Sequence, residues 1–380
     1  MSDIRFDLAE ILEESRKATG LDDFGPGDIR PGLEALAATY ETGGFNKRGR
    51  KRNRRRLVQL LSTRLKMQAA FSAHPEILER PISKPMVLTG MPRSGTSALF
   101  NLLARDPAAR PLLLWETQFP DPLDGLEDGQ PDPRRDALEA HYAKSREANP
   151  EFTKIHYAAA DNPEECVLVH AYSFHGVQMG VEIMREPYAS WYRQQDLSEM
   201  YTYYKKTLQL LDWQRPGERW LLKAPAHLWG IDPLIETFPD VSIAWSHRNP
   251  LLCTASICSM TWTMLDPVAE TPKHELGPVV MDFYATSLER GLAMRAEHDT
   301  QAHQPRRRLV AAGGAERPGP LSLRPFWPLP WAHLRRLPGC FLLSRPPPRP
   351  RPERLPWRLP RPAYPLPLRL PPPRPLWFLL

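Results

Sequence analysis

Glycines and hydroxyl side chains gather in one short segment of this chain in a pattern suited to binding an anion. Residues 85–100 read PMVLTGMPRSGTSALF, which predicts an apolar strand, a turn bounded by Gly90 and Gly95, and the start of a helix. The first N–H groups of a helix have no partner within it, and the helix dipole favours negative charge there. We therefore expect this loop to bind a phosphorylated ligand.

The spacing of the loop is that of the ATP-binding P-loop with one substitution. Gly90-x-x-x-x-Gly95 is followed by Thr96 and Ser97, whereas the P-loop needs a lysine at the position of Thr96. A P-loop kinase or NTPase would also need an acidic residue after another apolar strand, but the apolar residues 241–245 are followed by Ser-His-Arg. Such an enzyme is therefore the alternative function, and Mg²⁺-dependent ATP binding would favour it.

Two further motifs follow apolar stretches. The segment WLLKAPAHL, at residues 220–228, contains Lys223 and His227, and the segment HRNP, at residues 247–250, precedes Ser256. Together with the Gly90 loop, these motifs resemble the PAPS-dependent sulfotransferases, in particular the bacterial branch that carries a helical N-terminal extension. The resemblance covers about residues 20–298.

The resemblance implies a donor and the residues that hold it. The donor of this family is 3′-phosphoadenosine 5′-phosphosulfate (PAPS), and no metal ion is expected. Arg248 and Ser256 match the clamp on the 3′-phosphate, a group that ATP lacks, and an Arg fork suits a phosphate bidentately. Lys223 matches the residue that supports the leaving bridging oxygen. The residues that match the cradle of the 5′-phosphosulfate are Arg93, Ser94, Gly95, Thr96 and Ser97.

In-line sulfuryl transfer to a hydroxyl also needs a general base. In the branch with this loop type the base is a glutamate shortly after the first helix of the sheet, and Glu116 stands at that place. We expect burial beside Trp115 to raise the pKa of Glu116. His227 is the second candidate, because cytosolic sulfotransferases use a histidine just after the equivalent of Lys223. A helix-capping role for Glu116 remains the structural alternative.

The elements around these motifs predict an α/β protein. Strands at residues 86–89, 220–222 and 241–246 alternate with helices, which is typical of a parallel sheet that binds ligands beyond the carboxyl ends of its strands. We expect a P-loop-like three-layer domain over residues 81–299. A helical extension over residues 1–80 precedes it, with helices near 31–40 and 54–71. The aromatic stretch 188–213 either lines a pocket for a small-molecule or lipid-like alcohol acceptor or forms helix core.

The composition changes abruptly after Thr300. Residues 301–380 hold 21 of the 44 prolines, 15 arginines and no lysine or aspartate. We expect this Pro/Arg-rich tail to be disordered. A frameshift near residues 296–305 explains its composition, because GC-rich DNA read out of frame yields mostly Pro, Arg, Leu, Ala, Gly and Trp. The competing interpretation is an inactive sulfotransferase-like protein that uses the tail as a Pro-rich ligand.

The rest of the chain excludes several classes of protein. Without the tail, the net charge of +6 becomes about −7, so the charge of the whole chain does not indicate nucleic-acid binding. The basic cluster within residues 47–56 reads as a solvated helix start, with an anion-binding surface as the alternative. No apolar run is long enough to cross a membrane, and no cysteine pair has zinc spacing. We expect a cytoplasmic protein, and the sequence does not indicate its oligomeric state.

Overall fold

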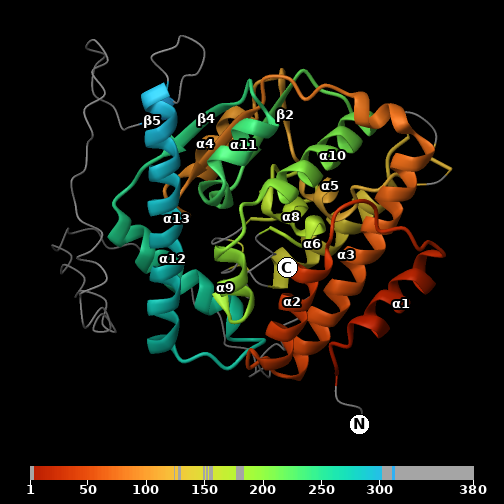
Figure 1. Ribbon diagram of the computed structural model, residues 1–380, viewed down its shortest axis with the longest axis horizontal. Coiled ribbons are helices and arrows are strands. Elements are labelled where there is room, and N and C mark those ends of the chain that lie inside the picture. Colours follow the sequence, from red (N-terminus) through yellow and green to blue (C-terminus); the bar gives the residue numbers. More distant parts are fainter. Residues whose placement is uncertain are drawn as a thin grey trace, which may run out of the picture. The chain divides into compact units, whose positions relative to one another are not determined.

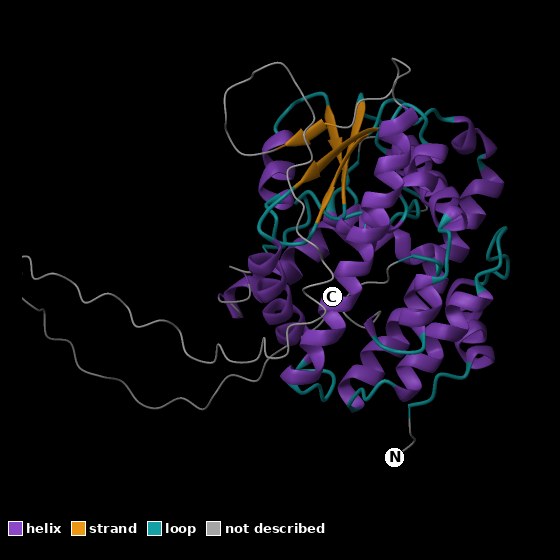
Figure 2. Cartoon of the chain, turned by 60° about the vertical axis from the view of Figure 1, so that its left-hand side comes forward, coloured by secondary structure: helices purple, strands orange, loops and turns teal. Residues whose placement is uncertain are grey.

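A five-stranded parallel sheet forms the centre of the described chain. The computed structural model describes residues 4–123, 125–126, 130–148, 150, 153, 157–176, 184–301 and 310–312. The strands are β1 (Met86–Gly90), β2 (Ala109–Pro111), β3 (Arg219–Lys223), β4 (Ser242–Ser246) and β5 (Val310–Ala312). Their order across the sheet is β2-β3-β1-β4-β5, and every neighbouring pair is parallel. The strands lie side by side, surrounded by helices (Figure 2).

The register of the central strands brings the three expected motifs to one edge of the sheet. Leu88 in β1 pairs with Lys223 at the end of β3, and Gly90 pairs with Ser246 at the end of β4. Strands β1 and β3 are buried along most of their length, as parallel strands covered on both faces are. The carboxyl ends of β1, β3 and β4 therefore present the Gly90 loop, Lys223 and the His247-Arg248 segment together.

Helix α4 (Thr96–Leu103) follows the loop and covers one face of the sheet. Its Phe100 packs against Leu88, Leu221 and Ala244, which come from the three central strands. This contact buries an apolar face of the helix and fixes the direction in which its first turn points. The N-terminus of α4 is thereby held at the carboxyl ends of β1 and β4.

The N-terminal extension consists of three helices that contact one another (Figure 1). They are α1 (Leu8–Thr19), α2 (Arg30–Thr42) and α3 (Lys47–Ala73). Asp7 caps α1 and Asn46 caps α3, each by accepting a hydrogen bond from a backbone N–H of the first turn. Helix α3 starts at Lys47, seven residues earlier than expected, because Asn46 provides a cap that allows the basic cluster to be helical.

The basic cluster ties the extension together. Arg50 donates to the carbonyl of Ile4 and pairs with Glu41 at 2.7 Å, and Arg54 pairs with Glu14 at 2.6 Å. Farther along α3, the buried Arg64 donates to three backbone carbonyls, those of Phe24, Pro26 and Tyr172. The positive charges of Arg50 and Arg54 are therefore paired within the fold, and the position of Arg64 links the extension to the rest of the chain.

The remaining helices surround the sheet and the segment that leads to it. After η1 (Pro75–Glu79), they are α5 (Leu114–Gln118), α6 (Pro133–Ala148), α8 (Val167–His170), η2 (Ala171–Ser173), α9 (Tyr188–Arg193), α10 (Ser198–Gln214), η4 (Pro225–Trp229), α11 (Ile231–Thr237), α12 (Pro250–Leu265) and α13 (Lys273–Gln301). The expected aromatic helix 188–213 is two helices, because Leu197 adopts a left-handed conformation between them (φ 69°).

Two strands were not expected from the sequence. Strands β2 and β5 have three residues each, which is too short for a hydrophobic period to be recognised. Strand β5 pairs with β4 and lies within the segment 300–380 that we expected to be disordered throughout, so that prediction is wrong for Val310–Ala312. The rest of the tail lies outside the described residues. Among the described helices, none is long and apolar enough to span a membrane.

Candidate active site

The Gly90 loop has the backbone geometry of an anion cradle. Gly90 adopts φ 140° and Gly95 φ 98°, both in the region that favours glycine. A Cβ on Gly90 would lie 2.5 Å from the carbonyl oxygen of Ser246, so this position also needs glycine for space. Gly95 is the N-cap of α4 and provides no side chain to bind the first N–H groups of the helix. These N–H groups remain available to an anion.

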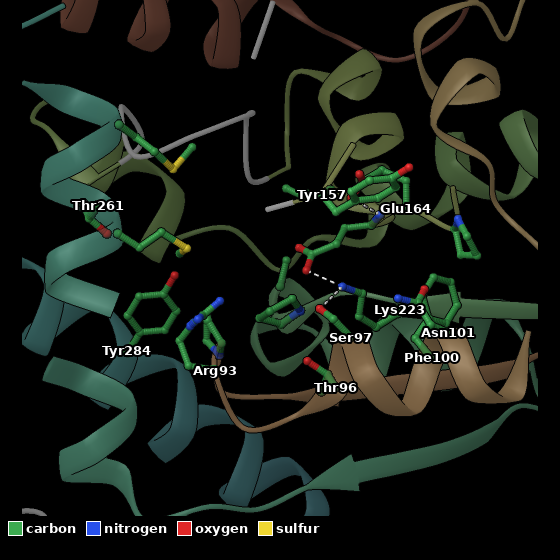
Figure 3. Close-up of a pocket in the computed structure, with 18 of the residues that line it drawn as sticks. Arg93, Thr96, Ser97, Phe100, Asn101, Tyr157, Glu164, Lys223, Thr261 and Tyr284 are labelled. Carbon is green, nitrogen blue, oxygen red and sulfur yellow. Dashed lines mark hydrogen bonds and ion pairs between the residues drawn. The ribbon is translucent and has the colours of Figure 1, made fainter. Parts of the chain in front are cut away.

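Lys223 links the loop to an acidic residue that the sequence analysis did not single out. The lysine ends β3, and its side chain is only 5% exposed. Its Nζ lies 3.1 Å from Ser97 Oγ and 2.6 Å from Glu165 Oε1 (Figure 3). The backbone N–H of Cys166, the next residue after Glu165, donates to the carbonyl oxygen of Lys223 at 2.9 Å. Lysine and glutamate are therefore joined by both side chain and backbone.

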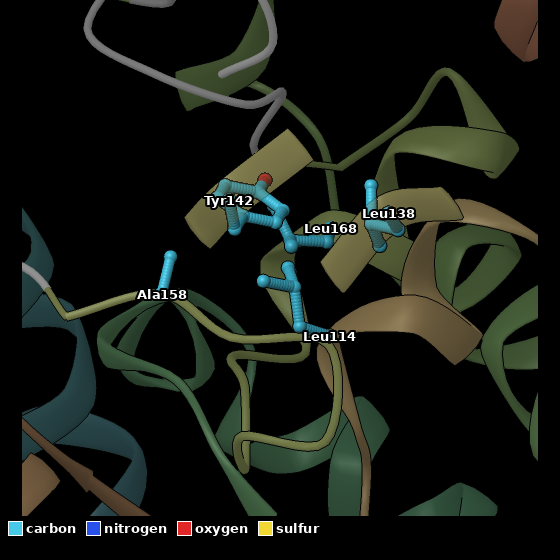
Figure 4. Close-up of a cluster of buried hydrophobic side chains, with 5 residues drawn as sticks. All are labelled: Leu114, Leu138, Tyr142, Ala158 and Leu168. Atoms are coloured by element: carbon cyan, nitrogen blue, oxygen red, sulfur yellow. The ribbon is translucent and has the colours of Figure 1, made fainter. Parts of the chain in front are cut away.

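The loop that carries Glu165 is held by the segment between β2 and α5. Glu164 N–H donates to the Leu112 carbonyl, and Leu114 N–H donates to the Asn162 carbonyl. A hydrophobic cluster packs beneath this loop and joins α5, α6 and α8 (Figure 4). Its buried members are Leu114, Leu138, Tyr142, Ala158 and Leu168. The position of Glu165 is thus set by a packed core on one side and by Lys223 on the other.

Arg248 and Ser256, the residues expected to bind the 3′-phosphate, contact the Gly90 loop at Arg93. Arg93 has a left-handed backbone (φ 69°), its Nε donates to Ser256 Oγ at 3.1 Å, and its carbonyl accepts from Arg248 Nη1 at 3.0 Å. Ser94 Oγ contacts Ser246 Oγ at 2.6 Å, which joins the loop to the end of β4. The structure therefore brings Arg93, Arg248 and Ser256 together at the edge of the sheet.

A cavity of about 340 Å³ opens beside the loop, lined by Lys223, Glu165, Ser97 and Thr96 together with Arg93. Arg248 and Ser256 contact Arg93 but are not among the lining residues. In Figure 3, Tyr284 and Thr261 lie on the opposite side of Lys223 from Phe100 and Asn101. The larger apolar side chains of the lining are Phe100, Val167, Met184, Trp229, Met260, Met264 and Phe283. The volume lies within the range of small-molecule sites.

Comparisons with known proteins agree with this geometry. A family model described as "Sulfotransferase family" matches residues 85–307. The chain belongs to the sulfotransferase family. Among solved structures, the sulfotransferase STF1 from Mycobacterium tuberculosis H37Rv is 31% identical, with a TM-score of 0.68, and the match covers 80% of this chain and 84% of that one. The sulfotransferase STF9 from Mycobacterium avium is 30% identical, with a TM-score of 0.70, and covers 78% and 77%. No curated protein matches the chain.

Glu116 of this sulfotransferase lies away from the cavity lining and is fully engaged elsewhere. Arg110 contacts both carboxylate oxygens at 2.8 Å, Arg215 Nε donates to Oε1 at 2.8 Å, and the Leu113 N–H donates to Oε2. Burial would raise the pKa of Glu116, but the Arg110 and Arg215 guanidinium groups lower it below its usual value. The expected rise of this pKa is wrong, because two arginines that were not considered neutralise the carboxylate. The contact with the Leu113 N–H is that of a helix cap.

His227 of the sulfotransferase also lies outside the cavity lining. It is fully buried in η4, where Nδ1 shares a 2.8 Å hydrogen bond with the Tyr201 hydroxyl. Burial lowers the pKa of His227 to about 3, and it lowers the pKa of the neighbouring His170 well below its usual value. Both imidazoles are therefore neutral, and they pack in a ring cluster and do not line the cavity.

This pair of histidines predicts a loss of stability in mild acid. Because the folded pKa values are lowered, the native state cannot take up the protons that unfolded histidines bind below about pH 6.5. The stabilisation is present above that pH and falls as the pH drops, by up to about 2.7 kcal/mol per pH unit for two histidines. Urea unfolding at pH 7.5, 6.5 and 5.5 measures the slope.

Removal of one of the two buried imidazoles isolates its share of this effect. His227→Gln should reduce the dependence of the unfolding free energy on pH by up to half. An unfolding free energy that stays constant between pH 6.5 and 5.5 would contradict the burial of two neutral imidazoles.

Proposed function

We propose that this sulfotransferase moves a sulfuryl group from PAPS to the hydroxyl of a small, partly apolar acceptor by in-line transfer. The observation that carries the proposal is the bridging position of Lys223, whose ammonium group contacts both Ser97 of the anion loop and Glu165. A cation, a carboxylate and an anion cradle thus meet within one cavity. These are the groups that transfer of a charged sulfuryl group to an alcohol needs.

The residues present fit the donor. The open N-terminus of α4 and the close approach at Gly90 suit a 5′-phosphosulfate on backbone N–H groups. Arg248 and Ser256, which meet at Arg93, suit a 3′-phosphate. Bound PAPS supplies the sulfuryl group and a phosphate oxygen as leaving group. Among the described residues, no group of three or more acidic, histidine or cysteine side chains could hold a metal ion, and the proposal needs none.

Glu165 takes the part of the general base in this proposal, in place of Glu116 and His227. Its carboxylate lines the cavity beside Lys223, whereas the other two candidates lie outside the lining. The acceptor oxygen forms a bond to sulfur while the sulfur–phosphate-oxygen bond breaks, and Glu165 receives the acceptor proton. Lys223 stabilises the negative charge that develops on the departing oxygen, which leaves as part of 3′,5′-ADP.

The cavity favours an alcohol with an apolar body. Three methionines and five aromatic rings line it together with the proposed reacting groups, and thioether side chains adapt to ligands of irregular shape. A lipid-like or polycyclic alcohol fits this lining better than a highly charged acceptor does. We also propose a cytoplasmic location, as the sequence analysis expects.

Two competing functions have less support. A P-loop kinase needs an acid after a strand that neighbours β1, and β4 is followed by His247 and Arg248. Nucleic-acid binding through the start of α3 is disfavoured because Arg50 and Arg54 pair with glutamates. Partner binding by the Pro-rich tail concerns residues outside the described part of the chain.

Calorimetry with nucleotides tests the donor. We expect 3′,5′-ADP to bind at least about 10-fold more tightly than 5′-AMP, because the Arg248 clamp adds a charge-assisted contact with the 3′-phosphate. Arg248→Ala should remove this difference while leaving the weak binding of 5′-AMP unchanged. Tighter binding of Mg·ATP than of 3′,5′-ADP would contradict the proposal and favour the P-loop NTPase.

Kinetics test the assignment of the base. Release of 3′,5′-ADP from PAPS, with 2-naphthol or 1-dodecanol as probe acceptors, should fall about 10²–10⁴-fold in kcat for Glu165→Gln, because a proton acceptor is lost. The affinity for 3′,5′-ADP should not weaken, since the carboxylate does not touch the phosphate clamp and its loss leaves Lys223 without a competing anion. Glu116→Gln is the comparison variant, because its effect should be on stability. Its unfolding free energy should fall by about 3 kcal/mol, as Arg110 and Arg215 lose their partner. A Glu165→Gln enzyme with the wild-type kcat would exclude Glu165 as the base.

A further inference from the structure

Two tyrosines on one face of α10 contact the segments that carry the two proposed reacting residues. Tyr201 and Tyr204 are three positions apart, so their side chains lie on the same side of the helix. Both are fully buried. The Tyr204 hydroxyl donates to Cys166 Sγ at 3.1 Å, and the Tyr201 hydroxyl shares a 2.8 Å hydrogen bond with His227 Nδ1. Neither tyrosine lines the cavity.

The residue that Tyr204 holds is connected to both the proposed base and the lysine. Cys166 follows Glu165 in sequence, and its N–H donates to the Lys223 carbonyl at 2.9 Å. A shift of Cys166 would therefore move the backbone of Glu165. It would also weaken the hydrogen bond that attaches this loop to β3. The distance of 2.6 Å between Glu165 Oε1 and Lys223 Nζ depends on this attachment.

The residue that Tyr201 holds belongs to the turn that follows Lys223. His227 lies in η4, whose Pro225 and Ala226 line the cavity. The start of this turn is also fixed to β1, because Ala224 N–H donates to the Leu88 carbonyl and Thr89 Oγ1 donates to the Ala224 carbonyl. Tyr201 thus holds this segment at His227, and the hydrogen bonds to β1 hold it at Ala224.

The cluster that contains these bonds is closely packed and uncharged. The His170 ring lies 4.7 Å from the Tyr204 ring and 5.2 Å from the His227 ring, measured between centroids. Burial raises the pKa of both tyrosines and lowers the pKa of both histidines, so every ring is neutral at pH 7. The cluster can hold the backbone of the site without adding a charge beside Lys223 and Glu165.

We propose that Tyr204, through Cys166, and Tyr201, through His227, are positioning residues that hold Glu165 and Lys223 in register for proton and sulfuryl transfer. This inference rests on the proposed function. A catalytic group misplaced by about 1 Å can lose about 10²-fold in rate, so removing a single hydroxyl behind the site should affect turnover. Donor binding should not change, because the anion loop and the Arg248 clamp lie on other elements.

The test compares Tyr204→Phe with Tyr203→Phe in the full chain. Tyr203 is the neighbouring buried tyrosine of α10, its ring lies 3.9 Å from the Arg64 guanidinium carbon, and its hydroxyl has no hydrogen-bond partner among the described residues. We expect Tyr204→Phe to lower kcat about 10-fold, with the KM for PAPS and the Kd of 3′,5′-ADP within about twofold of wild type. Tyr203→Phe should retain the wild-type kcat.

A double-mutant cycle shows whether the hydroxyl acts through the thiol. Cys166→Ala and Tyr204→Phe should each lower kcat, and the double variant should be no slower than the slower single variant, because both remove the same bond. Cys166→Ser should restore most of the lost kcat, since its hydroxyl can accept from Tyr204. Multiplicative losses in the double variant would overturn the inference.

The remaining outcomes separate this inference from the proposed function. If the wild-type chain releases no 3′,5′-ADP from PAPS with 2-naphthol, with 1-dodecanol or with water as acceptor, the proposed function fails and the inference fails with it. If the wild type is active and Lys223→Ala is inactive, but Tyr204→Phe matches Tyr203→Phe in kcat, only the inference is overturned. Equal losses in these two phenylalanine variants would indicate general destabilisation and would also overturn it.

Discussion

The site depends on the neutralisation of a lysine that is almost completely buried. The side chain of Lys223 is 5% exposed at the end of β3, and an ammonium group in that position is costly unless it is paired and hydrogen-bonded. Glu165 and Ser97 supply those partners at 2.6 Å and 3.1 Å. Because the lysine needs both partners, the start of α4, the end of β3 and the loop before α8 lie next to one another. A binding anion would meet a cation that the fold has already placed.

The parts of the site that the sequence predicted are those encoded in local patterns. The glycines and hydroxyls of residues 90–97, and Lys223 at the end of an apolar run, stand where the motifs imply, because strand, turn and helix start are set by neighbouring residues. Glu116 was proposed as the general base from its position in the sequence alone. Arg110 is six positions away and Arg215 is 99 positions away, and no sequence pattern shows that the fold brings both guanidinium groups to this carboxylate. Glu165 faces Lys223 only because the 160–166 loop is hydrogen-bonded to residues 112–115.

The strands and the helices around them could likewise be predicted only where a local sequence pattern encodes them. The central strands were predicted because parallel strands buried on both faces are continuous apolar runs. Strand β2 ends in Pro111 and has no such run, so its pairing with β3 could not be foreseen. The aromatic residues of α10 gave an ambiguous signal, since both core and pocket lining need large apolar rings. The structure assigns Tyr201 and Tyr204 to the core, directly behind the site.

A crystal structure of the chain with 3′,5′-ADP would show whether this site holds the donor. We expect the 5′-phosphate on the N–H groups at the start of α4, within reach of Lys223 Nζ, and the 3′-phosphate between Arg248 and Ser256. We also expect Glu165 to keep its place in the cavity lining, where it can face an acceptor. A nucleotide bound elsewhere, or a 5′-phosphate on the loop with Lys223 turned away from it, would contradict the assignment of this site to sulfuryl transfer.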